Sequence, residues 1–290
     1  MFLKPPPPPH QLKLLNLGCG SRYHHEWTNI DFHSTGKSVI GHNLLKGIPF
    51  DDKTFDLVYH SNVIEHFSKA DAPEFINECY RVLKPNGILR VVFPDLEKIV
   101  RQYIRLLAEL QNNNSQYESD YDWIMLELFD QMVRNVSGGE MFQYFVRESI
   151  PNEKFVLERC GIEAKNLIKA GKLEYDKMSG KYHVDSRDDI ITRLKYVRRK
   201  ILKAIDLINK KIFGRRYLAS SIGRFRLGGE IHQWMYDAYS MSRMLKSSGF
   251  KQIVVRDAIS SYLEGWSKYN LDTESDGMLQ SDCCYIEGIK

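Results

Sequence analysis

The chain has 290 residues, of which 27% are charged and 43% hydrophobic, and its formal net charge is +4. This composition is typical of a soluble globular protein, and the length suffices for one core with an insertion or for two small lobes. It excludes a membrane span, since no stretch approaches the roughly 20 apolar residues needed, and the mild charge does not by itself indicate nucleic-acid binding.

Residues 1–11 form a proline-rich leader with five consecutive prolines, Pro5 to Pro9. Such a run favours a polyproline II arm and lacks the apolar segment of a secretory signal. The chain has five cysteines, an odd number, and none of them forms a C-x-x-C pair. This predicts reduced thiols in the cytoplasm and no structural zinc.

The first element is an apolar run, Leu12 to Leu17, which predicts a buried parallel strand that leads directly into Gly18-Cys19-Gly20. Glycines let the backbone turn sharply and approach a ligand. A strand, glycine loop and helix together present free backbone N–H groups to a nucleotide-like ligand. Asp31 ends a second predicted strand, Trp27 to Asp31, and can accept hydrogen bonds from ribose hydroxyls.

The spacing of this motif disfavours a dinucleotide site. The dinucleotide fingerprint has a third glycine three residues after the second and an acid about 20 residues further on. Here Tyr23 stands in place of that glycine, and Asp31 arrives earlier. The motif therefore predicts an adenosine-binding half-site of another kind.

The next elements alternate between strand and helix patterns. They are a strand at Val39 to Leu44, a turn at Gly47 to Asp52, a strand at Phe55 to His60, a helix at Ala72 to Val82 that stops at Lys84-Pro85-Asn86-Gly87, and a strand at Ile88 to Phe93. Proline and glycine both end helices. The pattern predicts an α/β sheet with parallel strands.

The ordered motifs Leu-Asn-Leu-Gly-Cys-Gly, Phe-Asp-Leu-Val-Tyr, Ile-Glu-His and Arg-Val-Leu-Lys-Pro-Asn-Gly resemble those of the class I S-adenosylmethionine-dependent methyltransferases. The resemblance covers residues 12–95 and resumes at 228–290. It implies a Rossmann-like, doubly wound, seven-stranded sheet in which the seventh strand lies antiparallel between the fifth and sixth. It also implies S-adenosylmethionine as cofactor.

Residues 228–290 accordingly supply the end of the sheet, with a helix at Tyr236 to Ser248, a sixth strand at Gln252 to Arg256 and a seventh at Cys283 to Ile286. Residues 96–227 are then a helical insertion between the fifth strand and the last helix. Apolar residues at helical spacing predict helices over Asp95 to Leu110 and Asp122 to Val136. Because ligands bind at the carboxyl ends of parallel strands, this insertion is expected to act as a lid that selects the substrate.

Residues 188–213 combine isoleucine, leucine or valine at every third or fourth position with many lysines and arginines. A basic amphipathic helix of this kind can lie on an anionic membrane surface or meet an anionic substrate. It can equally pack its apolar stripe on the domain or on a second subunit of a homodimer. No recognisable RNA-binding module accompanies it, so nucleic acid is not expected as a partner.

The resemblance implies which residues meet the cofactor. They are Gly18, Cys19, Gly20, Asp31, Phe32, Asn43, Leu44, His60, Asn62 and His66. Cys19 is interpreted as a small residue in the loop rather than a nucleophile. Phe32 is either a cover for one face of the adenine or an ordinary aromatic. His66 is either a brace for the helix that follows or a cofactor or substrate contact.

Methyl transfer to an alcohol or amine also requires a route for the proton of the acceptor. His232 is the first candidate for a general base because its ordinary pKa is near neutral. Asp95 is the second, and Tyr236 is a positioning group, although His232 can equally be structural. In the insertion, Asp130, Arg134 and Glu140 are candidates for lining the substrate pocket. No metal site is expected, since the adjacent His24 and His25 seldom point at one ion.

The sequence therefore predicts S-adenosylmethionine-dependent methylation of a small molecule or sugar, in glycan or specialised-metabolite synthesis and most simply at oxygen. A methyltransferase that acts on a protein or a lipid-linked substrate through the basic helix is one alternative. The other alternative is a non-catalytic module of the same fold. Gly18, Gly20 and Asp31 argue against it, because a module that does not bind the cofactor has no physical need for all three.

Overall fold

The computed structural model of the chain describes residues 12–34, 36, 38–178, 190–274, 277–278 and 281–290, and side chains within 173–205 lie outside this description, as does the proline-rich leader. The described chain forms two compact units. Unit 1 contains the residues up to Arg105, Glu158–Ile162 and His232–Lys290, and unit 2 contains Leu106–Leu157 and Glu163–Ile231. The lid role expected for residues 96–227 remains a proposal.

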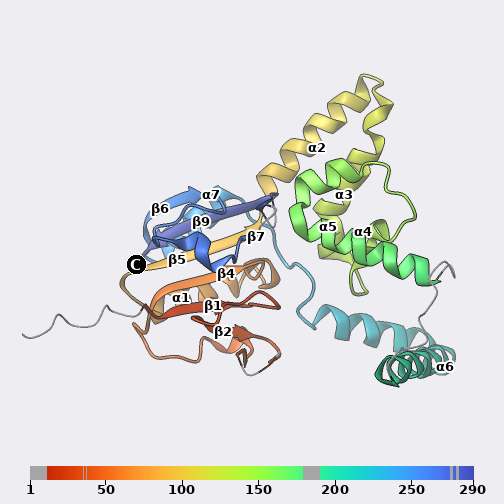
Figure 1. The fold of residues 1–290 in the computed structure, drawn as a ribbon, viewed down its shortest axis with the longest axis horizontal. Helices are drawn as coiled ribbons and strands as arrows, with labels where there is room; N and C mark the ends of the chain where they lie inside the picture. The colour runs from red at the N-terminus through yellow and green to blue at the C-terminus, as the bar shows by residue number, and fades with distance from the viewer. Residues whose placement is uncertain (1–11, 35, 37, 179–189, 275–276, 279–280) are drawn as a thin grey trace, which may run out of the picture. The chain divides into compact units, whose positions relative to one another are not determined.

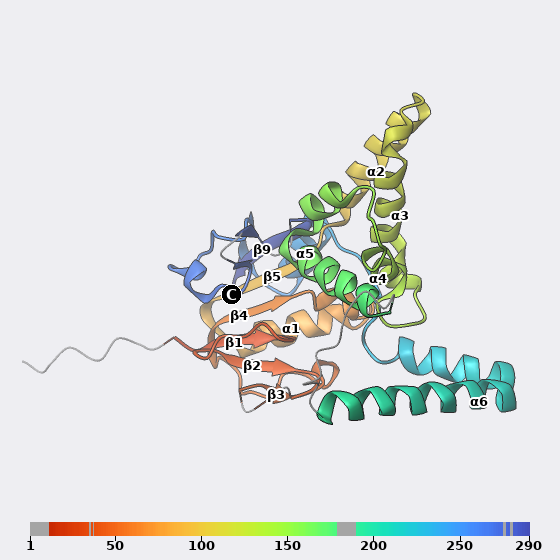
Figure 2. The same cartoon turned by 45° about the vertical axis from the view of Figure 1, so that its right-hand side comes forward.

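Unit 1 is built on a seven-stranded sheet with the order β3-β2-β1-β4-β5-β9-β6. The strands are β1 (Leu14–Leu17), β2 (Thr28–Asp31), β3 (Ile40–Gly41), β4 (Phe55–Ser61), β5 (Leu83–Pro94), β9 (Cys283–Ile289) and β6 (Lys251–Arg256). The first five run parallel, and β9 pairs antiparallel with both β5 and β6. The predicted α/β fold with an antiparallel last strand between two others is confirmed. Figures 1 and 2 show strands from both ends of the chain side by side in this sheet.

One face of the sheet packs against α1 (Ala72–Val82) and α7 (Ala238–Ser247). The predicted bounds of α1 are confirmed; its apolar side chains, among them Phe75 and Ile76, are buried against strand residues such as Val58 and Val91. Helix α7 begins at Ala238, because Asp237 forms a capping box with Ser240 at its amino end. Helix α1 contacts β5, and α7 contacts β6 and β9, so the two helices cover neighbouring parts of this face.

The other face is covered by the irregular segment 257–272, which contributes Trp266, Tyr269 and Leu271 to an aromatic core with Trp27 and Tyr59. Arg90 of β5 anchors this segment. Its side chain is fully buried and donates hydrogen bonds to Asp272 Oδ2 and Glu287 Oε1, each at 2.9 Å, and to the carbonyls of Asp257 and Ser260. The guanidinium also lies 4.5 Å from the Trp266 ring centroid.

The glycine loop leads to β2 without a helix between them. Residues 18–27, which link β1 to β2, contain turns and no helix. Ten residues are too few for a crossover with a helix of ordinary length between adjacent parallel strands. The N–H groups of this loop therefore have no helix dipole behind them.

Unit 2 consists of helices. They include the end of α2 (Leu96–Gln111), α3 (Glu118–Val133), α4 (Gly139–Phe145), most of α5 (Glu153–Met178) and α6 (Ile190–Arg226). Two of them are kinked at glycines with positive φ, α5 at Gly161 and α6 at Gly214. Figure 2 shows α6 as two arms folded back on each other at this kink.

The expected basic amphipathic helix corresponds to the first arm of α6, although side chains up to residue 205 lie outside the described part of the chain. In its described end, Leu207, Ile208, Ile212 and Phe213 are exposed. These apolar side chains are not covered by the rest of the described chain. Among the described helices, none combines the length and apolar character that crossing a bilayer requires.

Candidate functional site

The glycine loop after β1 is held in a tight turn by its own backbone and by Asp31. Cys19 N donates to Ile30 O at 3.0 Å, and Gly20 N donates to Asp31 Oδ2 at 2.7 Å. Gly18 and Gly20 have φ values of 63° and 52°, in the left-handed region that favours glycine. The loop and the acid predicted to bind the ribose are therefore in direct contact at the carboxyl edge of the sheet.

The two glycines differ in what surrounds them. A Cβ added to Gly18 would lie 2.3 Å from Cγ2 of Val63, whereas one added to Gly20 would meet nothing within 4 Å. Gly18 is thus required by packing against the segment after β4. Gly20 leaves open space, as expected at a position that a ligand approaches.

We expect Gly18→Ala to lower the free energy of unfolding by about 2–5 kcal/mol, because it combines left-handed strain with a steric overlap on Val63. Gly20→Ala carries only the backbone strain and should cost about 1–2 kcal/mol. Denaturant unfolding of both variants measures the difference. Adding Val63→Ala to Gly18→Ala should recover part of the loss. Equal destabilisation by the two glycine substitutions would contradict the packing role of Gly18.

The Cys19 thiol is buried in the loop. Burial, followed by the nearby charge of Asp31, raises the pKa of Cys19 to about 11. A thiol with this pKa is almost entirely protonated at neutral pH, so it is a poor nucleophile. The arrangement agrees with the interpretation of Cys19 as a small filler.

The residues predicted to meet the adenine lie in different settings. Phe32 is exposed beside the glycine loop, with its ring 4.7 Å from that of His33. The Asn43 side chain accepts a hydrogen bond from Leu45 N at 3.0 Å and caps the short helix η1 (Leu44–Lys46). Leu44 packs partly against the core. Of the three, Phe32 has the surface most available to a ligand.

His60 does not lie at the open edge of the sheet. Its imidazole is fully buried on the α1 face, 5.1 Å from the Phe75 ring, and neither ring nitrogen has a hydrogen-bond partner among the described residues. Burial lowers the pKa of His60 to about 3, so the ring is neutral. The expected cofactor contact of His60 is corrected to a core position, because β4 turns this side chain toward α1.

Asn62 marks the point where β4 ends. It has a φ of 52°, which is uncommon for a residue other than glycine, and its backbone N–H donates to Val92 O at 3.0 Å. Its side-chain oxygen lies 3.8 Å from Cys283 Sγ. This turn leads the chain into η2 (Ile64–His66), which carries the next polar group.

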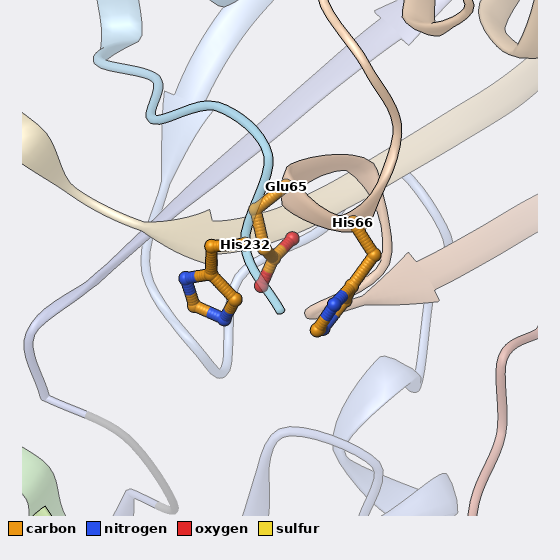
Figure 3. A group of neighbouring side chains, drawn as sticks. All are labelled: Glu65, His66 and His232. Atoms are coloured by element: carbon orange, nitrogen blue, oxygen red, sulfur yellow. The ribbon is translucent and has the colours of Figure 1, made fainter. Parts of the chain in front are cut away.

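Glu65, His66 and His232, here called the Glu65 cluster, converge at this edge, and one ligand atom from each lies within 4.8 Å of the others. Figure 3 shows the Glu65 carboxylate between the two imidazoles. Glu65 is buried, and neither carboxylate oxygen has a hydrogen-bond partner within the described ranges. Burial raises the pKa of Glu65 to about 8. The sequence analysis identified both histidines as candidates but missed Glu65 and the cluster.

The cluster is held by bonds between two segments that are far apart in the sequence. Glu65 O accepts hydrogen bonds from Gln233 N at 2.7 Å and Trp234 N at 3.3 Å, and Gln233 Nε2 donates to His66 O at 2.7 Å. Lys69 also lies over the Trp234 ring, 4.6 Å from its centroid. These contacts, here called the 233–234 strap, fix His232 beside η2.

The other two catalytic candidates lie next to this strap. Asp95 and Tyr236 form an isolated parallel bridge, and Leu96 N donates to Tyr236 O at 2.9 Å. The Asp95 carboxylate accepts from Glu97 N at 3.0 Å at the start of α2, and burial raises its pKa. Burial, and then the charge of Glu65, raise the pKa of Tyr236 to about 12. Asp95 thus caps a helix, and the Tyr236 phenol keeps its proton at neutral pH.

The three candidates from the insertion lie together in unit 2. Asp130 is buried and accepts from Glu140 N at 2.7 Å, which caps the start of α4. Arg134 pairs with Glu230, at 3.4 Å between guanidinium and carboxylate. The Glu140 side chain is exposed. Asp130 and Arg134 therefore have partners within their own unit, and a substrate contact by these three residues remains a proposal.

The comparisons with known proteins agree with this geometry. Residues 15–91 match the family profile described as "Methyltransferase domain". A "Probable S-adenosylmethionine-dependent methyltransferase" from Mycolicibacterium smegmatis is 39% identical over 56 residues, which are 19% of this chain and 21% of that protein. The likeness thus spans about a fifth of this curated relative.

Two solved structures align over most of the chain. One is a SAM-dependent methyltransferase from Archaeoglobus fulgidus, at 12% identity and a TM-score of 0.37, covering 96% of this chain and 86% of that one. The other, from Thermotoga maritima, is described as a possible histamine N-methyltransferase and aligns at 11% identity and a TM-score of 0.36, covering 96% and 82%. The profile match over residues 15–91, the order of the sheet and the contact of the glycine loop with Asp31 together support a class I S-adenosylmethionine-dependent methyltransferase.

Proposed function

We propose that the protein transfers a methyl group from S-adenosylmethionine to a hydroxyl of a small molecule or sugar, in glycan or specialised-metabolite synthesis. The observation that carries this proposal is the glycine loop, whose Gly20 N–H is bonded to Asp31 and whose outer side is open at Gly20. The family match over residues 15–91 supports methyl transfer in general and does not bear on the acceptor.

The residues at this edge fit the cofactor. An ionised carboxylate offers about four lone-pair sites, so Asp31 can hold Gly20 N–H and still accept from ribose hydroxyls. The open space at Gly20 admits the methionine part, and the exposed Phe32 can cover the adenine. When bound, S-adenosylmethionine supplies a methyl group on a positively charged sulfur. The protein then has to bind and orient both partners, which provides much of the acceleration.

The residues that follow β4 and β5 would bind the methyl acceptor. Val63 packs on Gly18, and Glu65 and His66 follow within the same turn. The packing of Val63 on Gly18 supports an acceptor site near the glycine loop that includes the Glu65 cluster. A hydroxyl of the acceptor held there would lie close to the carboxyl group of Glu65 and the imidazoles of His66 and His232.

Calorimetric titration of the purified protein with S-adenosylmethionine, S-adenosylhomocysteine and NAD tests the cofactor. We expect micromolar binding of the two sulfur compounds and none of NAD. Absence of binding by both sulfur compounds would contradict the proposal and favour a non-catalytic module. If they bind, methyl transfer to a panel of sugars and small alcohols, followed by mass spectrometry, identifies the acceptor class.

A second candidate is a substrate at an anionic membrane surface, favoured by the exposed apolar residues at 207–213 of α6 and the neighbouring Lys210 and Lys211. The protein should then sediment with anionic but not with neutral vesicles. Lys210→Glu with Lys211→Glu should abolish that binding and leave cofactor affinity intact. Unchanged sedimentation of the charge-reversed protein would contradict membrane binding through this helix. It would favour a second subunit as the partner of the exposed apolar residues at 207–213.

A further inference from the structure

We propose that Glu65, His66 and His232 form a binding site for one divalent transition-metal ion of the zinc type. The ion would be held at the carboxyl edge of the sheet, beside the turn that packs on the glycine loop. The site combines a carboxylate and an imidazole from η2 with a second imidazole from the segment that follows unit 2.

The first argument is the state of the Glu65 carboxylate. It is 1% exposed, and neither oxygen has a hydrogen-bond partner in the part of the chain that the structure describes. Leaving a carboxylate buried and unpaired is costly, and buried charges are usually paired or bound to metals. Figure 3 shows this carboxylate directed between the two imidazoles, where a cation would satisfy it.

The second argument is the set of donor atoms. Two imidazoles and one carboxylate, with further positions open, are the ligands of many catalytic zinc sites and of other divalent transition-metal centres. Magnesium and calcium prefer oxygen ligands, so this set does not favour them. One donor atom from each residue already lies within 4.8 Å of the others. Bonds of about 2.0–2.2 Å to one ion require only that the side chains close in by roughly an ångström.

The third argument is pre-organisation. The 233–234 strap joins the backbones that carry the ligands through three hydrogen bonds, two to Glu65 O and one to His66 O. Ligands held by such outer contacts lose less conformational entropy when an ion binds. His25, in the loop after β1, is exposed and is not part of the strap, so it serves as the control position.

The role that we assign to the ion rests on the proposed methyl transfer. The experiment that tests metal binding does not depend on methyl transfer. An ion with open positions can bind an acceptor hydroxyl and lower its pKa, so that the proton is released to solvent. His232 would then act as a ligand rather than as a lone general base. The substrate class becomes hydroxyl compounds able to coordinate a metal.

The test is metal binding by the full chain after removal of metals with a chelator. Calorimetry with Zn²⁺ and visible absorption with Co²⁺ should both give one ion per chain, and Mg²⁺ should bind far more weakly. Glu65→Gln and His232→Gln should each weaken Co²⁺ binding by at least about 100-fold, more than the loss of an outer contact. His25→Ala should bind Co²⁺ like the unaltered protein.

The melting temperature, measured with and without Zn²⁺, distinguishes loss of the metal site from misfolding of a variant. Zn²⁺ should raise the melting temperature of the unaltered protein and of His25→Ala, and should leave that of Glu65→Gln unchanged, since binding stabilises only a protein that has the site. Glu65→Gln without metal should remain folded, because glutamine has nearly the same shape as glutamate and brings no charge into the core. Absence of stoichiometric Co²⁺ binding, or equal binding by all variants, would overturn the inference. Binding of S-adenosylmethionine is measured in a separate titration. Failure of the metal site and failure of the proposed methyl transfer can therefore be told apart.

Discussion

Replacing Asp31 with alanine should lower the affinity for S-adenosylmethionine by roughly 10- to 150-fold. A hydrogen bond to a charged group is worth about 1.5–3 kcal/mol, and every 1.4 kcal/mol changes affinity tenfold. Asp31 is expected to bind the ribose, and it also accepts the Gly20 N–H at 2.7 Å, so its loss affects both the contact and the shape of the loop. Calorimetric titration measures the change.

Two further variants separate these effects. Asp31→Asn keeps an oxygen for Gly20 N–H and should preserve the loop, but it lacks the charge, so its affinity should lie between those of the unaltered protein and Asp31→Ala. Asp51→Ala removes an exposed acid from the turn before β4 and should leave affinity unchanged. If Asp31→Ala bound the cofactor as tightly as Asp51→Ala, the ribose site would have to lie elsewhere.

Arg90→Ala should destabilise unit 1 by about 3–5 kcal/mol, the usual cost of removing one partner from a buried ion network. The Arg90 guanidinium is the buried cation that pairs with both Asp272 and Glu287, whose side chains are 2% and 0% exposed. Its loss would leave Arg256, 3.4 Å from Glu287, as the remaining cation beside the two carboxylates among the described residues, although neutral donors such as the Tyr59 hydroxyl still bond them. The segment 257–272 would also lose its anchor on β5. Denaturant unfolding followed by circular dichroism measures the loss.

Arg101→Ala is the matched control. Arg101 forms an ion pair with Glu97 one turn away on α2, and its side chain is 76% exposed. Exposed pairs of this kind contribute about 0.3–0.5 kcal/mol. The same substitution should therefore have an effect several-fold smaller at position 101 than at position 90. Similar unfolding midpoints for the two variants would show that the buried network is not what holds segment 257–272.

The elements predicted well from the sequence are those with local signals. Helix α1 begins and ends where Pro73 and the glycine turn at 84–87 indicated, although β5 already starts at Leu83 and includes those residues. The strands were found from short apolar runs, usually within two residues of their bounds. Residues 21–27 have no apolar periodicity, and in the structure they form turns without a helix.

The functional site also contains contacts that local sequence signals predict and contacts that they do not. The contact between Gly20 and Asp31 was predictable because a loop and the end of an adjacent parallel strand must meet at one edge. The burial of His60 was not, because period-2 alternation does not say which face of a two-sided core a residue meets. The Glu65 cluster was least accessible, since no spacing in the sequence relates Glu65 to His232. The hydrogen bonds of the strap join the segments that carry these two residues.

The order of strands in the sheet has a consequence for how the protein folds during synthesis. β9 lies between β5 and β6, yet it is made after both, and all of unit 2 is made between β5 and β6. Until β9 is available, β5 presents an unpaired edge, and such edges promote aggregation. Closing these distant pairings is also slow, because loop entropy is lost before any contact forms. We therefore expect the nascent chain to depend on chaperones until residues 283–289 have emerged from the ribosome.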